Sequence, residues 1–236
     1  MAVFITGGTG YVGQRLTAGL VARGHRVRVL TRPHSIPRVA AGAEPVVGDA
    51  LDASSYASTL TRDDTLVHLV GTPHPSPAKA AEFRRVDLPS IRAAVSAARS
   101  ASVAHLVYVS VAHPAPLMHA YIDVRCEGEA AIASAKLTAT VMRPWYVIGP
   151  GHRWPVILIP LYAVVEIVPS TRSTARRLGL VTITQMVQSL VYAVEHPPAT
   201  GTIRVVEVPE IKRGAGVVSG FSRTSVWCLA LAGPGA

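Results

Sequence analysis

Short apolar runs rich in β-branched residues alternate along the chain with longer stretches in which apolar residues recur at helical spacing. This alternation is typical of strand–helix–strand units, whose parallel sheet is buried on both faces and whose crossovers are right-handed. Helices are predicted over 11–24 and 88–101, and Gly24 suits the end of the first. The predicted strands cover 3–6, 27–30, 45–47, 66–70, 106–111 and 138–142.

The alternation stops after Gly149. A Pro-rich apolar stretch follows, then a helical pattern over 184–196 and a strand-like run over 202–208, and no internal repeat is visible. The sequence therefore predicts an α/β fold with a doubly wound parallel sheet over 1–150. A small substrate lid over 151–211 is expected to pack on this core, and a tail of uncertain order, rich in Gly, Ser and Ala, is expected over 212–236.

Composition narrows the classes of function. A chain of 236 residues with 49% hydrophobic residues can bury a sizeable core, and its length fits one α/β domain with an appendage better than two domains. The net charge of +9 would suit an anionic partner, but Lys and Arg are spread without a run of four and aromatics make up only 6%. Nucleic-acid binding is therefore not expected.

The cysteines and the termini bear on the compartment. Cys126 and Cys228 lie far apart and show neither metal-ligand spacing nor a disulfide framework, which indicates a reducing, cytoplasmic setting without a metal site. The chain enters an apparent strand at once, so no signal peptide is indicated. The longest apolar run, 155–169, is interrupted by Pro160 and Glu166 and is too short to span a bilayer.

The strongest motif is TGGTGYVG at 6–13, which follows the first predicted strand and opens the first predicted helix. Glycines are needed there because the chain turns tightly, the backbone approaches a pyrophosphate and the helix packs closely on the strand. The helix N-terminus then faces the phosphates. An ordinary strand-to-helix turn is the alternative. The alternating chain around the motif favours a dinucleotide site made by Gly7, Thr9, Gly10, Tyr11, Val12 and Gly13.

Selectivity for the ribose is expected where the second strand ends. Thr31 stands near the position at which a carboxylate would bond the 2′-hydroxyl of NAD, and Arg32 follows it. A guanidinium there can clamp a 2′-phosphate, so NADP is favoured, with NAD and a solvated Arg32 as alternatives. After the third strand, Asp49 and Ala50 are placed near the adenine. An N-cap or turn role for Asp49 is equally open.

Taken together, these motifs resemble those of the short-chain dehydrogenase/reductase superfamily, on the extended or atypical side that includes epimerase/dehydratase-like and NmrA-like proteins. The resemblance runs from Ala2 to about Ile211, through TGGTGYVG, GDALD, LVYVSV, AYIDVRCEGE, MRPWYVIGPG and LVTITQMV. It implies a Rossmann fold, and it implies that backbone near Pro144, Trp145 and Tyr146 passes the nicotinamide. Val70 and Gly71 are expected to bind the cofactor as well.

The resemblance also implies a catalytic pair. Tyr121 matches the Tyr that exchanges a proton with a carbonyl or alcohol oxygen, and Arg125 stands where the family has a Lys that holds the ribose and favours the ionised Tyr. At helical spacing both side chains can reach one ligand, and a plain helix face is the alternative. Both residues are expected to contact the cofactor.

Three departures from the family pattern bear on catalysis. Arg125 cannot give up its proton at physiological pH, so a proton relay through it is disfavoured. Ser110 is the candidate catalytic hydroxyl, although by spacing that group would stand one or two residues later, at Val111 or Ala112. Asp87 stands where the family usually has Asn. His113 can polarise a substrate oxygen or can be a solvated loop residue.

Three functions follow from this reading: an NADP-dependent oxidoreductase acting on a small molecule, a non-catalytic NADP-binding regulator or assembly factor, and an epimerase or dehydratase. The apolar lid, with Trp154 and Tyr162, does not suit a sugar diphosphate and favours a lipophilic carbonyl or alcohol substrate. A core or homodimer role for the same residues is the alternative. A peripheral membrane contact beside Arg172, Arg176 and Arg177 is a weaker one.

Overall fold

The fold is given by a computed structural model that describes residues 1–115, 117–151 and 179–214. Its centre is a seven-stranded sheet in the order β3-β2-β1-β4-β5-β6-β9, with every pair parallel. The strand order reverses between β1 and β4, and ligands of such sheets bind at this point, beyond the carboxyl ends of the strands. The strands are β1 (Ala2–Thr6), β2 (Arg26–Thr31), β3 (Glu44–Val47), β4 (Asp64–His68), β5 (His105–Val109), β6 (Ala139–Arg143) and β9 (Ile203–Glu207).

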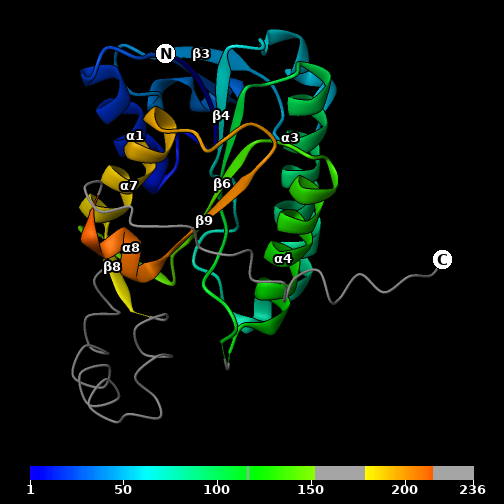
Figure 1. Cartoon of the computed structure of the whole chain (residues 1–236), viewed down its shortest axis with the longest axis vertical. Helices are drawn as coiled ribbons and strands as arrows, with labels where there is room; N and C mark the ends of the chain where they lie inside the picture. Colours follow the sequence, from blue (N-terminus) through cyan, green and yellow to red (C-terminus); the bar gives the residue numbers. More distant parts are fainter. Residues whose placement is uncertain (116, 152–178, 215–236) are drawn as a thin grey trace, which may run out of the picture.

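Helices cover both faces of this sheet (Figure 1). α1 (Tyr11–Ala22) packs against α7 (Ile183–Glu195) on one face, and α3 (Leu88–Ser100) packs against α4 (His119–Ser134) on the other. The doubly wound α/β fold is therefore confirmed. The remaining elements are η1 (Pro33–Arg38), η2 (Ala53–Ser55), η3 (Ala57–Thr59), η4 (Pro77–Lys79), α2 (Ala80–Glu82), the π-helical η5 (Phe83–Asp87), α8 (Val208–Arg213) and a small parallel sheet of β7 (Tyr146–Ile148) and β8 (Leu180–Thr182).

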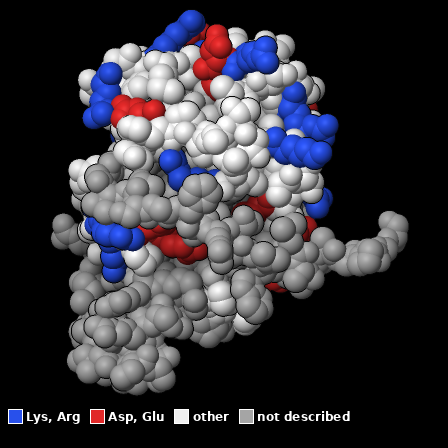
Figure 2. Space-filling model, in the orientation of Figure 1, with Lys and Arg blue, Asp and Glu red and all other residues white. Residues whose placement is uncertain are grey.

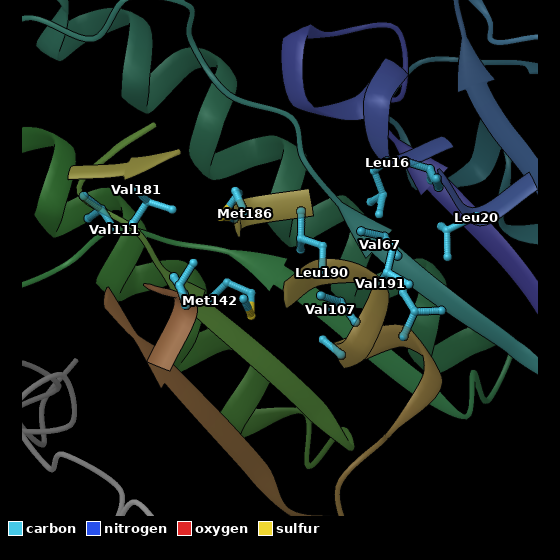
Figure 3. Packing of buried hydrophobic residues seen from close by; sticks show 14 of the residues in the cluster. Leu16, Leu20, Val67, Val107, Val111, Met142, Val181, Met186, Leu190 and Val191 are labelled. Atoms are coloured by element: carbon cyan, nitrogen blue, oxygen red, sulfur yellow. The ribbon is translucent and has the colours of Figure 1, made fainter. Parts of the chain in front are cut away.

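The core lies in two clusters because successive strand residues point to opposite faces. In β1, Val3 and Ile5 enter the cluster under α1 and α7, whereas Phe4 enters the cluster under α3 and α4. Figure 3 shows side chains of the first cluster, among them Leu16 from α1 and Leu190 from α7. Full burial of such a side chain contributes roughly 1.5–3 kcal/mol. This burial anchors both helices on one face of the sheet.

The end of the predicted lid belongs to the body of the fold. Within the range 151–211, β9 extends the main sheet by pairing with β6, and α7 packs on α1. A lid over 151–211 that packs beside the sheet was the prediction, and 203–207 departs from it by joining the sheet itself, because a strand pattern shows its face but not its partner. Residues 152–178, which carry Trp154 and Tyr162, lie outside the described residues. α8 ends at Arg213, so the first two residues of the predicted tail are helical, and 215–236 also lie outside.

The fourth strand lies two residues earlier than predicted, because its polar start is neutralised. Asp64 pairs with Arg28 of β2 at 2.5 Å, which allows a carboxylate to be fully buried in the sheet. On the face seen in Figure 2, the basic side chains are scattered over the described surface. Among the described residues, no helix has both the length and the apolar character needed to cross a membrane.

Candidate functional site: the carboxyl edge of the sheet

The glycine turn joins β1 to α1 at the point where the strand order reverses. Gly7 has φ +79°, a conformation that favours glycine, and its carbonyl accepts the N–H of Gly10 at 3.1 Å. A Cβ on Gly13 would lie 2.3 Å from the oxygen of Gly7, so the helix can approach this closely only with glycine. A Cβ on Gly10 would meet only that same oxygen, at 3.2 Å. Gly10 therefore leaves open space beside the turn.

The N-terminus of α1 suits an anion. Its N-cap is Gly10, which supplies no side-chain hydrogen bond, and its first turn has no acidic residue. The free N–H groups of such a helix end attract phosphate. Thr9 and Val12 are half-buried in the same turn, and the ring of Tyr11 lies under the guanidinium of Arg15 at 4.3 Å. The residues present therefore fit the pyrophosphate of a dinucleotide.

The ends of β2 and β3 carry the residues predicted for the adenosine half. Thr31 is buried, and Arg32 is exposed at the start of η1, where no carboxylate stands in the segment 31–38. Asp49 accepts the N–H of Leu51 at 2.9 Å through its side chain, which is the turn role left open as the alternative to an adenine contact. Ala50, next to it, is half-buried. The positive charge at Arg32 is thus unopposed by carboxylates of its own segment.

Tyr121 and Arg125 do meet, as their spacing on α4 predicts. The guanidinium carbon of Arg125 lies 5.0 Å from the centre of the Tyr121 ring and 5.8 Å from that of Tyr108. These are cation–π distances. Tyr121 is half-buried and packs on Phe83, with 4.9 Å between ring centres. The two residues predicted as a catalytic pair are therefore in direct contact and do not merely share a helix face.

The guanidinium of Arg125 bridges the ends of β4 and β5. Its Nη1 donates to the carbonyls of Val109 at 3.1 Å and Val70 at 3.5 Å, and its Nη2 pairs with Asp87 at 2.6 Å. Burial alone would lower the pKa of Arg125, but the phenols and the carboxylate around it raise it above its ordinary value. Its buried Nε has no hydrogen-bond partner among the described residues. A ribose hydroxyl would satisfy this donor, so Arg125 also fits a dinucleotide.

Ser110 takes part in a buried network rather than standing free. Its hydroxyl donates to Glu129 of α4 at 2.6 Å, and Arg143 of β6 donates to the same carboxylate at 3.0 Å. Burial alone would raise the pKa of Glu129, but hydrogen bonds from His113, Arg143 and Ser110 lower it to about 2. Arg143 also bonds Glu207 of β9 at 3.0 Å, so the network ties α4 to three strand ends.

This network changes the interpretation of two predicted residues. The proton of Ser110 is directed at Glu129, so in this arrangement it is not offered to a substrate oxygen. His113 is only 7% exposed, and its Nε2 lies 3.7 Å from Glu129, so the solvated-loop reading is wrong. Among the described residues, no three His, Cys, Asp or Glu side chains gather as metal ligands.

The chain after β6 runs beside the chain after β5. The carbonyl of Pro144 accepts the N–H of Ala112 at 2.9 Å, and Trp145 is half-buried against Tyr146 with 5.5 Å between ring centres. Gly71, after β4, lies against Arg125, because a Cβ there would stand 2.4 Å from Nη2. Site residues that follow three different strands, β4, β5 and β6, therefore lie together at one edge of the sheet.

Sequence reasoning missed several members of this site. Thr72 donates a hydrogen bond to Asp87, and the ring of Tyr108 lies against the guanidinium of Arg125. The fully buried His68 is hydrogen-bonded to Thr6 and Ser90, where the strand order reverses. The sequence did hold one signal of this arrangement. Asp87 and Arg125, the two charged departures from the family pattern, carry opposite charges, which indicates an ion pair.

Residues 7–150 match the family described as NAD(P)H-binding. The chain belongs to this family. It is 29% identical over 228 residues to a ceramide reductase of Caulobacter vibrioides, across 92% of this chain and 70% of the relative. It is also 29% identical over 171 residues to a 4-hydroxy-2-methyl-3-oxo-4-farnesyl-3,4-dihydroquinoline-1-oxide ketoreductase of Stigmatella aurantiaca, across 63% of this chain and 51% of that protein.

The fold comparison agrees with the family assignment. A short-chain dehydrogenase/reductase superfamily protein from Agrobacterium tumefaciens, solved with bound NAD, superposes with a TM-score of 0.64 at 18% identity. The match covers 88% of this chain and 77% of that one. The family match confirms the predicted NAD(P)-binding domain and NAD(P) cofactor, and the superposition confirms the fold that the resemblance implies.

Proposed function

We propose that the protein is an NADP-dependent reductase of a small, lipophilic carbonyl compound, with Tyr121 as the proton donor. One observation carries the proposal: the Arg125 guanidinium lies 5.0 Å from the Tyr121 ring, at the strand ends beside the glycine turn. A fixed positive charge beside a phenol is the arrangement that a proton-donating Tyr needs, because the charge stabilises the phenolate left behind.

The roles of the residues follow from their positions. When bound, the cofactor supplies the hydride that adds to the carbonyl carbon. The glycine turn and the N-terminus of α1 bind its pyrophosphate, and Arg125 offers its free Nε–H to a ribose hydroxyl. The Tyr121 hydroxyl gives its proton to the carbonyl oxygen, which completes the alcohol. The chain after β6, with Pro144 and Trp145, covers the nicotinamide end.

The preference for NADP over NAD rests on Arg32. It is exposed where β2 ends, and the following η1 adds His34 and Arg38 without any acidic residue. A partly desolvated guanidinium–phosphate pair contributes about 1.5–3 kcal/mol, which is roughly tenfold or more in affinity.

The lipophilic substrate is supported by the relatives. One is named for a ceramide and the other for a farnesylated quinoline oxide. In this chain the half-buried Trp145 offers apolar surface at the same edge. The apolar segment that was predicted to line the substrate pocket lies within 152–178, outside the described residues.

A non-catalytic NADP-binding regulator is the second candidate, and one observation favours it. Ser110, the predicted second hydroxyl, donates its hydrogen bond to Glu129, so in this arrangement it does not assist Tyr121 at a substrate oxygen. Such a protein would bind NADPH tightly, and no carbonyl compound would cause it to oxidise NADPH.

The two candidates are separated by comparing NADPH binding with NADPH oxidation. Tyr121→Phe should lower turnover of a long-chain ketone about 100-fold or more, because general acid catalysis is lost, while NADPH affinity by fluorescence titration stays within about threefold. Tyr192→Phe is the matched control: this Tyr lies on α7, stacked on His196 at 4.0 Å, and its loss should change neither quantity. NADPH binding without oxidation across a panel of ketones, quinones and aldehydes would favour the regulator. Full turnover of Tyr121→Phe would exclude Tyr121 as the acid.

A further inference from the structure

The two charged departures from the family pattern form a single buried ion pair. Arg125 Nη2 and Asp87 Oδ1 are 2.6 Å apart, with the Arg side chain 5% exposed and the Asp side chain fully buried. Removing one partner of such a pair leaves an uncompensated charge in the interior, which costs far more than the pair contributes. Each of the two residues therefore requires the other.

The remaining capacity of the Asp87 carboxylate is filled by Thr72. Its Oδ2 accepts both the backbone N–H of Thr72 at 3.0 Å and the Thr72 hydroxyl at 2.6 Å. An Asn at position 87 has only one acceptor atom, so it would turn an amide donor toward either the guanidinium or the two Thr72 donors. The site is therefore built for a carboxylate.

Two backbone features bring the pair together. Asp87 ends the π-helical turn η5 (Phe83–Asp87), which runs directly into α3 and widens the helix at this residue. Such turns are common at functional sites. Gly71 lies on the other side, where a Cβ would stand 2.4 Å from Arg125 Nη2 and 3.3 Å from Asp87 Oδ1. Only glycine leaves room for the guanidinium.

We propose that Asp87, Thr72 and Gly71 are positioning residues that hold Arg125 at the cofactor ribose and beside Tyr121, so that Arg125 and Asp87 replace the family's Lys and Asn only as a pair. The inference rests on the proposed function. It follows that Arg125→Lys alone does not recreate the family's site, because the ammonium has no planar fork to reach Asp87, Val109 and Val70 together.

The test is a double-mutant cycle with Arg125→Lys, Asp87→Asn and both changes. NADPH affinity is measured by fluorescence titration, and the unfolding midpoint in urea is measured without cofactor. Both single changes should weaken NADPH binding. The double variant should bind at least fivefold more tightly than the product of the two single effects predicts, since it recreates a matched pair. Coupling below fivefold would overturn the proposal.

A second buried pair provides the control. Arg28 and Asp64 are 2.5 Å apart with side chains 12% and 0% exposed, at the opposite, amino edge of β4. The corresponding Arg28→Lys and Asp64→Asn cycle should lower the unfolding midpoint but leave NADPH affinity within twofold. Equal effects of the two cycles on NADPH affinity would show that the Arg125 pair acts only through stability, and would overturn the positioning role.

A milder change covers the case in which Asp87→Asn does not fold. Thr72→Val keeps the shape and the backbone N–H but removes one donor to Asp87. It should weaken NADPH binding threefold or more with a smaller loss of stability than Asp87→Asn causes, and unchanged binding would overturn the proposal. None of these readouts needs turnover, so a protein without reductase activity would refute the proposed function and leave the pair still tested through NADPH affinity.

Discussion

Mild acid should destabilise the protein through two buried histidines, before most carboxylates titrate. His68 is fully buried at the end of β4, with Nδ1 2.8 Å from the Thr6 hydroxyl and Nε2 3.3 Å from that of Ser90. Burial, with the charge of Arg125, lowers its pKa from 6.5 to about 3. His105 is likewise buried beside Thr140, and burial with the charge of Arg204 lowers its pKa from 6.5 to about 4.

The direction in which stability changes with pH depends on which state, folded or unfolded, binds protons at the higher pH. Both pKa values are lower in the folded protein, so below pH 6.5 the unfolded chain takes up protons that the folded chain refuses. The stability from these groups is therefore present above pH 6.5 and is lost as pH falls toward 3–4. Between pH 7 and pH 5.5 each histidine should cost about 1 kcal/mol, so the two together remove a sizeable part of a typical stability of 5–15 kcal/mol.

The assay is urea unfolding at a series of pH values between 7 and 5.5. His68→Gln should be less stable than the parent at pH 7, because the Thr6 and Ser90 contacts change, but its loss of stability across this range should be smaller by about 1 kcal/mol. His34→Gln, at an exposed position, is the control substitution of the same type. The reasoning is refuted if His68→Gln and the parent lose the same free energy over this range.

Three further predictions concern the cofactor site and the network behind it. Gly10→Val should abolish NADPH binding with a nearly normal melting temperature, whereas Gly13→Ala should lower the melting temperature, because its Cβ would meet backbone atoms at 2.3 Å and 2.6 Å. Arg32→Ala should reduce the NADP-to-NAD affinity ratio about tenfold in calorimetric titrations, and an unchanged ratio would exclude this residue. The pKa of the Glu129 carboxyl is lowered in the folded protein, so its contribution to stability is present above pH 4.5 and is lost as pH falls toward about 2. Glu129→Gln should therefore lack this part of the loss of stability in acid.

The layout of the fold could be predicted from the sequence because its signals are local. Most of the strands contain a short apolar run, α3 and α7 show a helical period, and the glycine turn has its own sequence signature. The strand 203–207 was predicted as a strand but placed in a lid, since its pairing with β6 is non-local. In the same way, nothing local to Ser110 indicates that Glu129, on a different element, accepts the hydrogen bond of its hydroxyl.

The site could be predicted as a set of residues but not as a set of interactions. Taken one at a time, the two residues are only departures from the family pattern: Arg125 cannot release its proton, and Asp87 stands where the family usually has Asn. The structure joins them at 2.6 Å, with Thr72 and Gly71 fitted around them. A buried charge without a partner is too costly to keep, so two departures of opposite charge at positions that face one another are better explained as one substitution. On this argument the altered motif is an alternative form of the same site, in which a permanent cation lies beside the phenol.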